Sequence, residues 1–161
     1  KYEFQNNELG GIIDEVVDEL KSKAHEKQIV IKVEGAHDLP QFIFDRHKIR
    51  EIVINLLHNA IKYTPPKGNI MICVEVIAKS AQKVMRLSVK DSGIGITKED
   101  LQRLFIKFGR SKEAKTIDPG GMGLGLYFVK KVAEDHGGGA WAESAGLGKG
   151  STFVVEIPFR Q

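Results

Sequence analysis

The order of its periodic segments constrains the fold of this chain more than any other feature. Apolar residues recur at helical spacing in three segments, namely 9–27, 45–62 and 123–136. Strand patterns lie between and after them, at 29–33, 41–44, 69–77, 83–90, 140–145 and 151–157. Strand pairs joined by short turns, without strict strand–helix–strand alternation, predict a two-layer α/β (α+β) sandwich. Its sheet is expected to be mixed and mostly antiparallel, with helices on one face.

Local signals set the ends of these elements. Asp45 is a good N-cap for the second helix, and Pro65 and Pro66 cannot continue it. Thr97 is expected to cap a further short helix, with Asp100 at the third helical position. Glycines 137–139 end the third long helix.

Composition indicates a soluble domain of ordinary size and points to no particular class of function. The 161 residues fit one domain, and 42% hydrophobic residues suffice for a core. The net charge of +3 is too small and too evenly spread to predict nucleic-acid binding. No apolar run approaches the ~20 residues that span a bilayer, so no membrane contact is expected of this domain. The single cysteine, Cys73, favours a reducing, cytoplasmic compartment.

The second helix carries a polar strip beside its apolar face. Asn55, Asn59 and Lys62 follow each other at i, i+4 and i+7. Amide oxygens are hard ligands that suit Mg²⁺, and a lysine meets phosphate as a point charge. A solvated helix face would show the same residues, so the strip alone leaves both interpretations open.

Glycine-rich segments follow one strand and precede one helix. Asp91 ends a strand and leads into Gly93 and Gly95, where a carboxylate could accept a hydrogen bond from an exocyclic amino group such as that of adenine. Residues 120–126 lead into the third long helix, whose free N–H groups would bind an anion. Their spacing is neither a Rossmann fingerprint nor a P-loop. Alone, the segment 148–153 indicates only a hairpin turn.

The connection at 107–122 has no periodicity and carries Lys, Arg, Pro and Gly. A connection of that length inside a compact domain is typical of a functional loop or lid.

Together and in this order, these segments resemble the catalytic ATP-binding domain of sensor histidine kinases, a branch of the Bergerat-fold ATPases. The resemblance runs from about Leu9 to Pro158. It rests on an asparagine box at 55–64, glycine boxes at 91–96, 121–126 and 148–153, and a phenylalanine box at 105–110. It implies a Bergerat ATP-binding fold with an ATP lid at about 107–122.

The resemblance implies a role for each matching residue. Asp91, supported by Thr152, would bind the adenine amino group, and Tyr63 would pack against the base. Asn59 would ligate Mg²⁺, with Asn55 beside it, and Lys62 would contact phosphate. Phe105 and Phe108 would anchor the lid, and Arg110 and Lys112 would neutralise the transferred γ-phosphoryl group. The remaining expected ATP contacts are Gly93, Gly95, Ile96, Gly121, Met122, Gly123, Leu124, Gly125 and Leu126.

Two positions depart from the family pattern. Gly109 stands where many relatives carry a larger residue, which implies a looser lid. Met122 stands where a small hydroxyl residue is common, which bears on the lid geometry, and neither departure removes a group that the chemistry needs. Related ATP hydrolases carry a glutamate general base at the position of Asn55, and an amide cannot take a proton from water. The expected reaction is therefore phosphoryl transfer. Two alternatives stay open, a nucleotide-sensing module without transfer and a serine kinase of the anti-sigma-factor type.

None of the five histidines lies in a segment like the family's phosphoacceptor signature. Since the chain begins at Lys1, it is expected to be cut from a longer protein. Residues 1–8 are then the connector from an upstream dimerisation and histidine-phosphotransfer hairpin, and residues 9–161 are the catalytic domain. The expected partners are ATP and ADP, that hairpin within a homodimer, and a response regulator. Membrane anchoring of the parent is left open.

Overall fold

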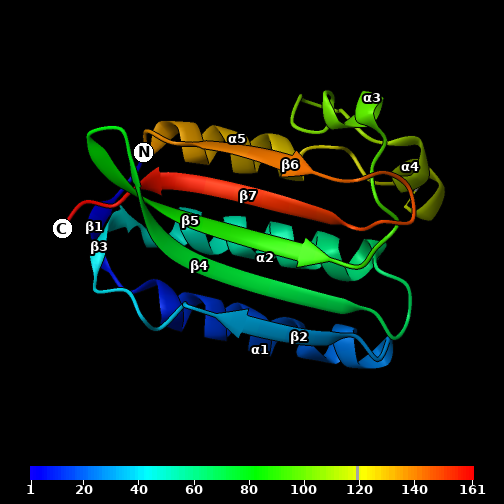
Figure 1. The fold of residues 1–161 in the computed structure, drawn as a ribbon, viewed down its shortest axis with the longest axis horizontal. Coiled ribbons are helices and arrows are strands. Elements are labelled where there is room, and N and C mark those ends of the chain that lie inside the picture. The colour runs from blue at the N-terminus through cyan, green and yellow to red at the C-terminus, as the bar shows by residue number, and fades with distance from the viewer. Residues whose placement is uncertain (119) are drawn as a thin grey trace.

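A five-stranded sheet covered on one face by three helices makes up most of the computed structural model (Figure 1), which describes residues 1–118 and 120–161. Residue 119, within the predicted lid, lies outside the described residues. The strands lie in the order β2 (Val30–Glu34), β4 (Asn69–Lys79), β5 (Gln82–Asp91), β7 (Ser151–Pro158) and β6 (Gly139–Glu143). Strands β2 and β4 are parallel, and the other neighbours are antiparallel. The predicted mixed, mostly antiparallel sheet is confirmed.

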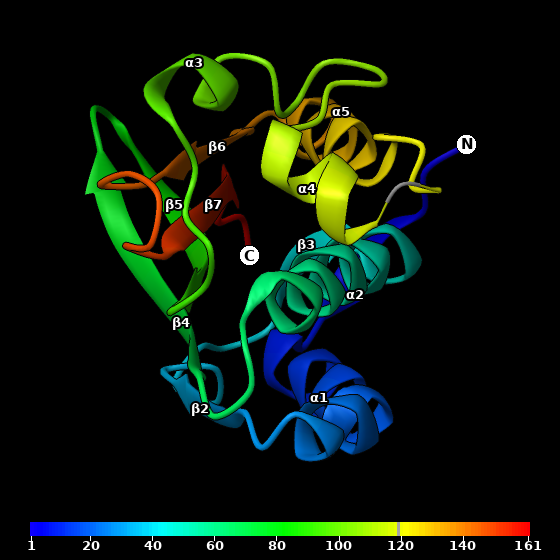
Figure 2. The same cartoon turned by 90° about the vertical axis from the view of Figure 1, so that its right-hand side faces the viewer.

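The long helices form the second layer of the sandwich. They are α1 (Leu9–Glu26), α2 (Arg46–Tyr63) and α5 (Gly125–Asp135), and they lie on the same side of the sheet (Figure 2). Periodicity predicted all three. Two short helices, α3 (Lys98–Leu101) and α4 (Lys112–Ile117), lie beyond one end of the sheet. Within residues 1–118 and 120–161, no helix has both the length and the apolar character needed to cross a bilayer.

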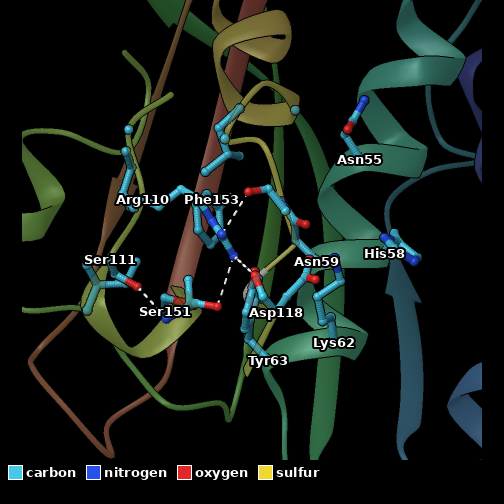
Figure 3. A pocket seen from close by; sticks show the side chains of 18 of the residues that line it. Asn55, His58, Asn59, Lys62, Tyr63, Arg110, Ser111, Asp118, Ser151 and Phe153 are labelled. Atoms are coloured by element: carbon cyan, nitrogen blue, oxygen red, sulfur yellow. Dashed lines mark hydrogen bonds and ion pairs between the residues drawn. The ribbon is translucent and has the colours of Figure 1, made fainter. Parts of the chain in front are cut away.

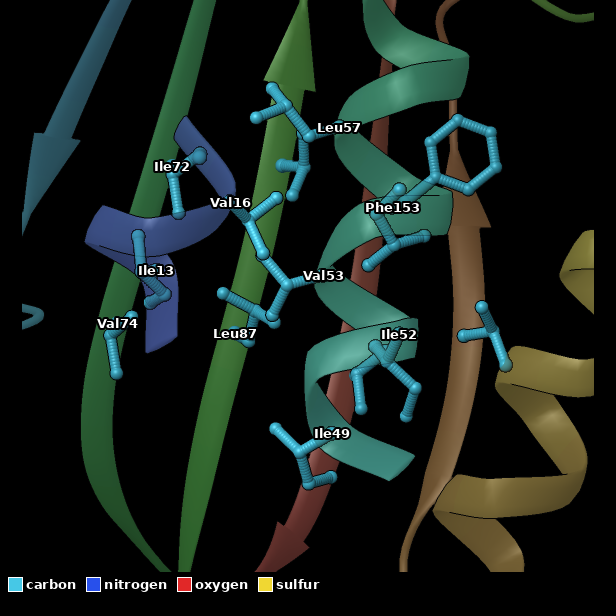
Figure 4. Packing of buried hydrophobic residues seen from close by; sticks show 14 of the residues in the cluster. Ile13, Val16, Ile49, Ile52, Val53, Leu57, Ile72, Val74, Leu87 and Phe153 are labelled. Carbon is cyan, nitrogen blue, oxygen red and sulfur yellow. The ribbon is translucent and has the colours of Figure 1, made fainter. Parts of the chain in front are cut away.

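The hydrophobic core lies between the sheet and helices α1 and α2 (Figure 4). Ile52, Val53 and Leu57 of α2 are fully or almost fully buried. They pack toward residues of the central strands such as Leu87, which is also buried. Burial of this face fixes the rotation of α2, and therefore fixes which of its residues remain for a site.

The N-terminal segment predicted as a connector forms a strand. Strand β1 (Phe4–Asn7) pairs antiparallel with β3 (Phe42–Asp45), in register from Phe4 opposite Asp45. Both oxygens of the Asp45 carboxylate are used. One accepts from the backbone N–H of Glu3 at 2.7 Å, and the other caps α2 by accepting from Lys48 N–H at 3.0 Å. The pattern could not indicate this strand, because its four residues are partly or largely exposed.

A buried histidine joins this corner to α5. His136 is 6% exposed, and its Nε2 accepts the backbone N–H of Asp45 at 3.1 Å. The other ring nitrogen, Nδ1, lies 2.8 Å from the carbonyl of Val132. Burial lowers the pKa of His136, so the ring is neutral and Nδ1 carries the proton that it donates to Val132. The rings of Tyr2 and Phe4 meet His136 edge-on, with centroids 5.6 and 5.0 Å away.

Candidate functional site

A cavity of about 290 Å³ opens between α2, the ends of β5 and β7, and the segment that carries α4 (Figure 3). It gathers residues from every glycine and asparagine box identified in the sequence. The predicted residues that line it are Asn55, Asn59, Lys62, Tyr63, Asp91, Gly95, Ile96, Arg110, Gly121, Met122, Gly123, Leu124, Gly125 and Leu126.

Asp91 lines the cavity where β5 ends, and we call this part of the cavity the sheet end. The side chain is at the last position of β5 and only 6% exposed. Its Oδ1 accepts from the backbone N–H groups of Gly93 at 2.8 Å and Ser151 at 3.2 Å. Its Oδ2 accepts from the Ser151 hydroxyl at 3.0 Å. Burial raises the pKa of Asp91, and these three hydrogen bonds oppose that rise. The carboxylate keeps acceptor capacity on Oδ2 for a ligand.

The residue that supports Asp91 is Ser151, whereas Thr152 was expected from the sequence. Successive side chains of a strand point to opposite faces of the sheet. Ser151 of β7 is opposite Asp91 in the β5–β7 register and points into the cavity, so Thr152 must point away from it. The expected supporting role of Thr152 is therefore wrong by one residue.

Gly95 lets two loops meet beside the sheet end. Its φ is +73°, and a Cβ there would lie 2.0 Å from the carbonyl oxygen of Gly146. Any other residue would force these loops apart. Gly93 does not line the cavity, but its N–H group holds Asp91.

The polar strip of α2 forms one wall of the cavity. Asn55 donates its amide hydrogen to the carbonyl of Glu51 at 2.9 Å, which leaves its Oδ1 as an acceptor. A Cβ on Gly125 would lie 2.7 Å from that oxygen, so only glycine lets the start of α5 come this close to Asn55. Asn59 lies one turn further along α2 and also faces the cavity (Figure 3).

The first turn of α5 forms a second wall. Among the described residues, no side chain caps this helix at Leu124. The first N–H groups of a helix lack partners within it, and its dipole places partial positive charge there. Gly121, Gly123 and Gly125 bring this backbone to the cavity, and Gly123 has a φ of +70°. This wall is suited to a phosphate group.

The far side of the cavity is made by the segment around α4, and we call this the lid end. The sequence indicated no helix here, yet Ser111 caps α4 by accepting from Ala114 N–H at 3.0 Å. Arg110 was expected to face the γ-phosphoryl group. In the structure its guanidinium donates to the carbonyl of Gly121 at 2.8 Å and of Ala114 at 2.9 Å, and to that of Asp118.

Lys62 reaches across to the lid end. Its ammonium group lies 2.8 Å from Oδ2 of Asp118 (Figure 3). This hydrogen bond, together with the charges of Lys62 and Arg110, lowers the pKa of Asp118, so the carboxylate is ionised at neutral pH.

Two predicted lid residues do not line the cavity. Lys112 is exposed on α4. Phe108 is 58% exposed, with φ at +65°, and is not among the lining residues. Phe105 is the better anchor, since its ring centroid lies 6.3 Å from that of Phe153, a cavity residue.

The cavity is also lined by residues that were not expected from the sequence, namely His58, Ile94, Leu104, Gly109, Ser111, Ala114, Asp118, Ser151 and Phe153. Five of them lie within a recognised box and two adjoin one, so membership of a box was the available signal for most. His58 lies on α2, where its Nε2 is 3.4 Å from the ammonium of Lys23, and burial lowers its pKa.

The described side chains do not by themselves supply a complete set of ligands for a metal ion. The described residues contain no group of three or more His, Cys, Asp or Glu side chains that could hold one. The amide oxygens of Asn55 and Asn59 fit Mg²⁺ only as part of a shell completed by water and phosphate, as this ion commonly has.

Comparison with known proteins identifies the family of this chain. Residues 44–161 match the family described as histidine kinase-, DNA gyrase B- and HSP90-like ATPase. The chain is 38% identical over 117 residues to the sensor histidine kinase WalK of Bacillus subtilis (strain 168), covering 73% of this chain but only 19% of WalK.

Solved structures show the same fold. The catalytic domain of histidine kinase ThkA superimposes with a TM-score of 0.79 at 32% identity, covering 99% of each chain. Full-length ShkA, solved in complex with AMPPNP, superimposes with a TM-score of 0.84 at 28% identity, covering 100% of this chain and 32% of ShkA. The chain therefore belongs to the histidine kinase-, DNA gyrase B- and HSP90-like ATPases, and within them it is an ATP-binding catalytic domain of the sensor histidine kinase type.

Proposed function

We propose that the cavity binds Mg-ATP with the adenine at the sheet end, and that the bound γ-phosphoryl group is transferred to a histidine of a separate domain. The observation that carries the proposal is the setting of Asp91. A buried carboxylate with three donors and one free acceptor position can read an amino group in a fixed place. Tyr63 and Ile96 line the cavity beside it and offer apolar surface to a base.

The phosphates would then extend toward the first turn of α5. There they would meet the free N–H groups of that turn and the cation of Lys62. Asn59 would contribute an oxygen to Mg²⁺, with Asn55 beside it. The ion would offset negative charge on the phosphates, which supports phosphoryl transfer more than covalent help from the protein does.

The residue at the position of the hydrolases' glutamate base favours transfer over hydrolysis. Asn55 stands beside the phosphate wall and cannot accept a proton from water. In the proposed reaction the bond between the γ-phosphorus and the β–γ bridging oxygen breaks, a bond to an imidazole nitrogen forms, and ADP leaves. Arg110 would leave its lid carbonyls to face the transferred group, with Lys112 as a less direct contributor.

The acceptor and the partners belong to the proposal as well. The chain spans less than a fifth of WalK, so a longer kinase would supply a dimerisation domain that carries the histidine, with residues 1–8 as its connector. A ThkA structure in complex with the response regulator protein TrrA supports a response regulator as the next acceptor. The domain would act in the cytoplasm without contacting nucleic acid or membrane.

Calorimetric titration with AMPPNP, with and without Mg²⁺, tests the site. We expect Mg²⁺-sensitive binding that Asp91→Asn weakens about ten-fold or more, the cost of a hydrogen bond to a charged group. The matched control is Asp38→Asn, which changes an exposed aspartate outside the cavity. Equal affinity of the Asp91 variant and the wild type would mean that the base lies elsewhere.

A second experiment separates transfer from sensing. With γ-labelled ATP, the chain alone should stay unlabelled, and acid-labile label should enter a histidine-bearing dimerisation domain supplied in the same polypeptide. Label on a serine would instead indicate the anti-sigma-factor type of kinase. Binding without any transfer to the joined domain would indicate a nucleotide-sensing module.

A further inference from the structure

The ion pair between Lys62 and Asp118 joins two parts of the cavity that are far apart in sequence. Lys62 is in the last turn of α2, and Asp118 follows the end of α4. Their charged atoms are 2.8 Å apart, and the side chains are 29% and 32% exposed. Both residues line the cavity. The pair therefore uses the one lysine that α2 presents to the site.

The Asp118 carboxylate also lies against the glycine loop. A Cβ on Gly121 would lie 2.7 Å from Oδ2 of Asp118, the same oxygen that Lys62 binds. The backbone N–H of Gly121 donates to the Asp118 carbonyl at 3.2 Å. A carboxylate between a lysine ammonium and a glycine loop at a helix N-terminus occupies the kind of place that suits a phosphate.

Arg110 holds Asp118 in this place from the lid end. Its guanidinium donates to the carbonyls of Ala114 and Gly121, which flank Asp118, and to the carbonyl of Asp118 itself. Arg110 thus fixes the conformation of the loop that positions the Asp118 carboxylate. Moving Arg110 toward a ligand would loosen that loop and release Asp118 with it.

We propose that Asp118 is an internal competitor of the nucleotide phosphates, which occupies Lys62 when the site is empty and is displaced when a nucleotide binds. The inference rests on the proposed placement of the phosphates beside Lys62. A ligand that binds only the fraction of molecules in which Lys62 is free shows an affinity reduced by that fraction. Asp118 would therefore weaken the binding of phosphorylated nucleotides and speed the release of ADP.

The test is the affinity of AMPPNP, ADP and adenosine for the wild type and for Asp118→Asn. We expect the variant to bind AMPPNP and ADP about three- to ten-fold more tightly, as if a competent fraction of roughly 0.1–0.3 became unity. Adenosine has no phosphate, so its affinity should stay the same. Asp18→Asn is the matched control, because Asp18 makes a comparable 3.0 Å pair with Lys21 on the outer face of α1.

A second variant shows whether the effect passes through Lys62. In a Lys62→Ala background, Asp118→Asn should no longer change the affinity for AMPPNP, because the lysine for which Asp118 and the phosphates compete is gone.

Weaker binding by Asp118→Asn would show that the carboxylate serves the nucleotide or its metal, and would overturn the inference. An equal gain for adenosine would also overturn it, since the effect would then be a looser lid. If the wild type binds AMPPNP and no variant differs, only the competition fails; if the folded wild type binds none of the three ligands, the proposed function fails and the competition with it.

Discussion

Asp91 and Asp118 are aspartates at opposite ends of one cavity, and their surroundings differ in kind. Asp91 is buried where two paired strands end, and it accepts three hydrogen bonds from residues of that sheet end. The side chain of Asp118 is about one-third exposed, and its carboxylate pairs with Lys62 of α2. Burial raises the pKa of Asp91, whereas a cationic partner lowers that of Asp118. The sheet end is thus built before any ligand arrives, and the lid end is held by contacts that a ligand can replace.

The two ends also differ in how much apolar surface they bury, and the sheet end buries more. Leu57 of α2 is fully buried between the layers, whereas Ile117 of α4 is 45% exposed. The described residues of α4 include none that is buried. Polar contacts at the lid end therefore replace the hydrophobic burial that fixes the sheet end, and such contacts are worth less in water.

The largest expected effect comes from truncating one apolar residue at each end. Leu57→Ala should lower the free energy of unfolding by about 2–5 kcal/mol, because it leaves a cavity in a packed core. Ile117→Ala should change it by less than about 0.5 kcal/mol. Urea denaturation of both variants measures the difference. Similar losses in the two variants would show that α4 belongs to the cooperative core.

Alanine substitutions of one serine at each end should have effects of intermediate size and can be compared directly. Ser151→Ala removes one donor from the buried Asp91 carboxylate and should cost about 1.5–3 kcal/mol of global stability. Ser111→Ala removes the cap of α4, worth about 1 kcal/mol to that helix, and global unfolding should not register it. Hydrogen exchange would locate the second effect as faster exchange at residues 112–117. A global loss for Ser111→Ala would remove the distinction between the ends.

Asp91→Asn should separate stability from binding at the sheet end. The asparagine oxygen can accept from Gly93 and Ser151 N–H, and its amide can donate to the Ser151 hydroxyl, so every present partner is kept. Removing a buried charge should stabilise the empty protein at pH 7 by the amount typical of single stabilising substitutions, on the order of 1 kcal/mol. Nucleotide affinity should fall in the same variant.

The gain in stability from Asp91→Asn should depend on pH. The pKa of Asp91 is higher in the folded than in the unfolded chain, so the native state binds the proton more tightly. Wild-type stability therefore decreases as pH rises from the ordinary aspartate pKa through the raised one. The advantage of Asp91→Asn should vanish on acidification through that window. Denaturation series at several pH values would show this, and an advantage that grows on acidification would contradict it.

A small effect is also expected for the ion pair at the lid end. Lys62→Ala should change global stability by no more than about 1 kcal/mol, because both partners are partly exposed and the pair is screened by salt. Thermal unfolding at low and high salt measures it. A loss comparable to that of Leu57→Ala would mean that the pair holds the domain together.

The sequence predicted the layers and the sheet end better than the lid end. Residues of α2 repeat with the helical period because they are buried, and burial is what periodicity reports. Ser151 could have been predicted in place of Thr152. Side chains alternate along β7, so only one of the two can lie on the same side of the sheet as Asp91.

The helix α4 and the role of Asp118 were out of reach for different reasons. The six residues of α4 bury no apolar face and so leave no period, although Ser111 offered a capping signal. The pair between Lys62 and Asp118 joins positions 56 residues apart, and no local pattern indicates it. Contacts of that kind depend on the tertiary packing of the helices and loops, which a local sequence pattern does not indicate.

The corner at Asp45 connects the first residues of the chain to two walls of the cavity. One carboxylate ties the backbone of Glu3 to the first turn of α2, and His136 ties the same residue to the end of α5. The N-terminal strand is thus anchored to one end each of the two helices whose other ends carry Asn59 and follow the glycine loop. These three hydrogen bonds form a rigid linkage between the N-terminus and the helix layer.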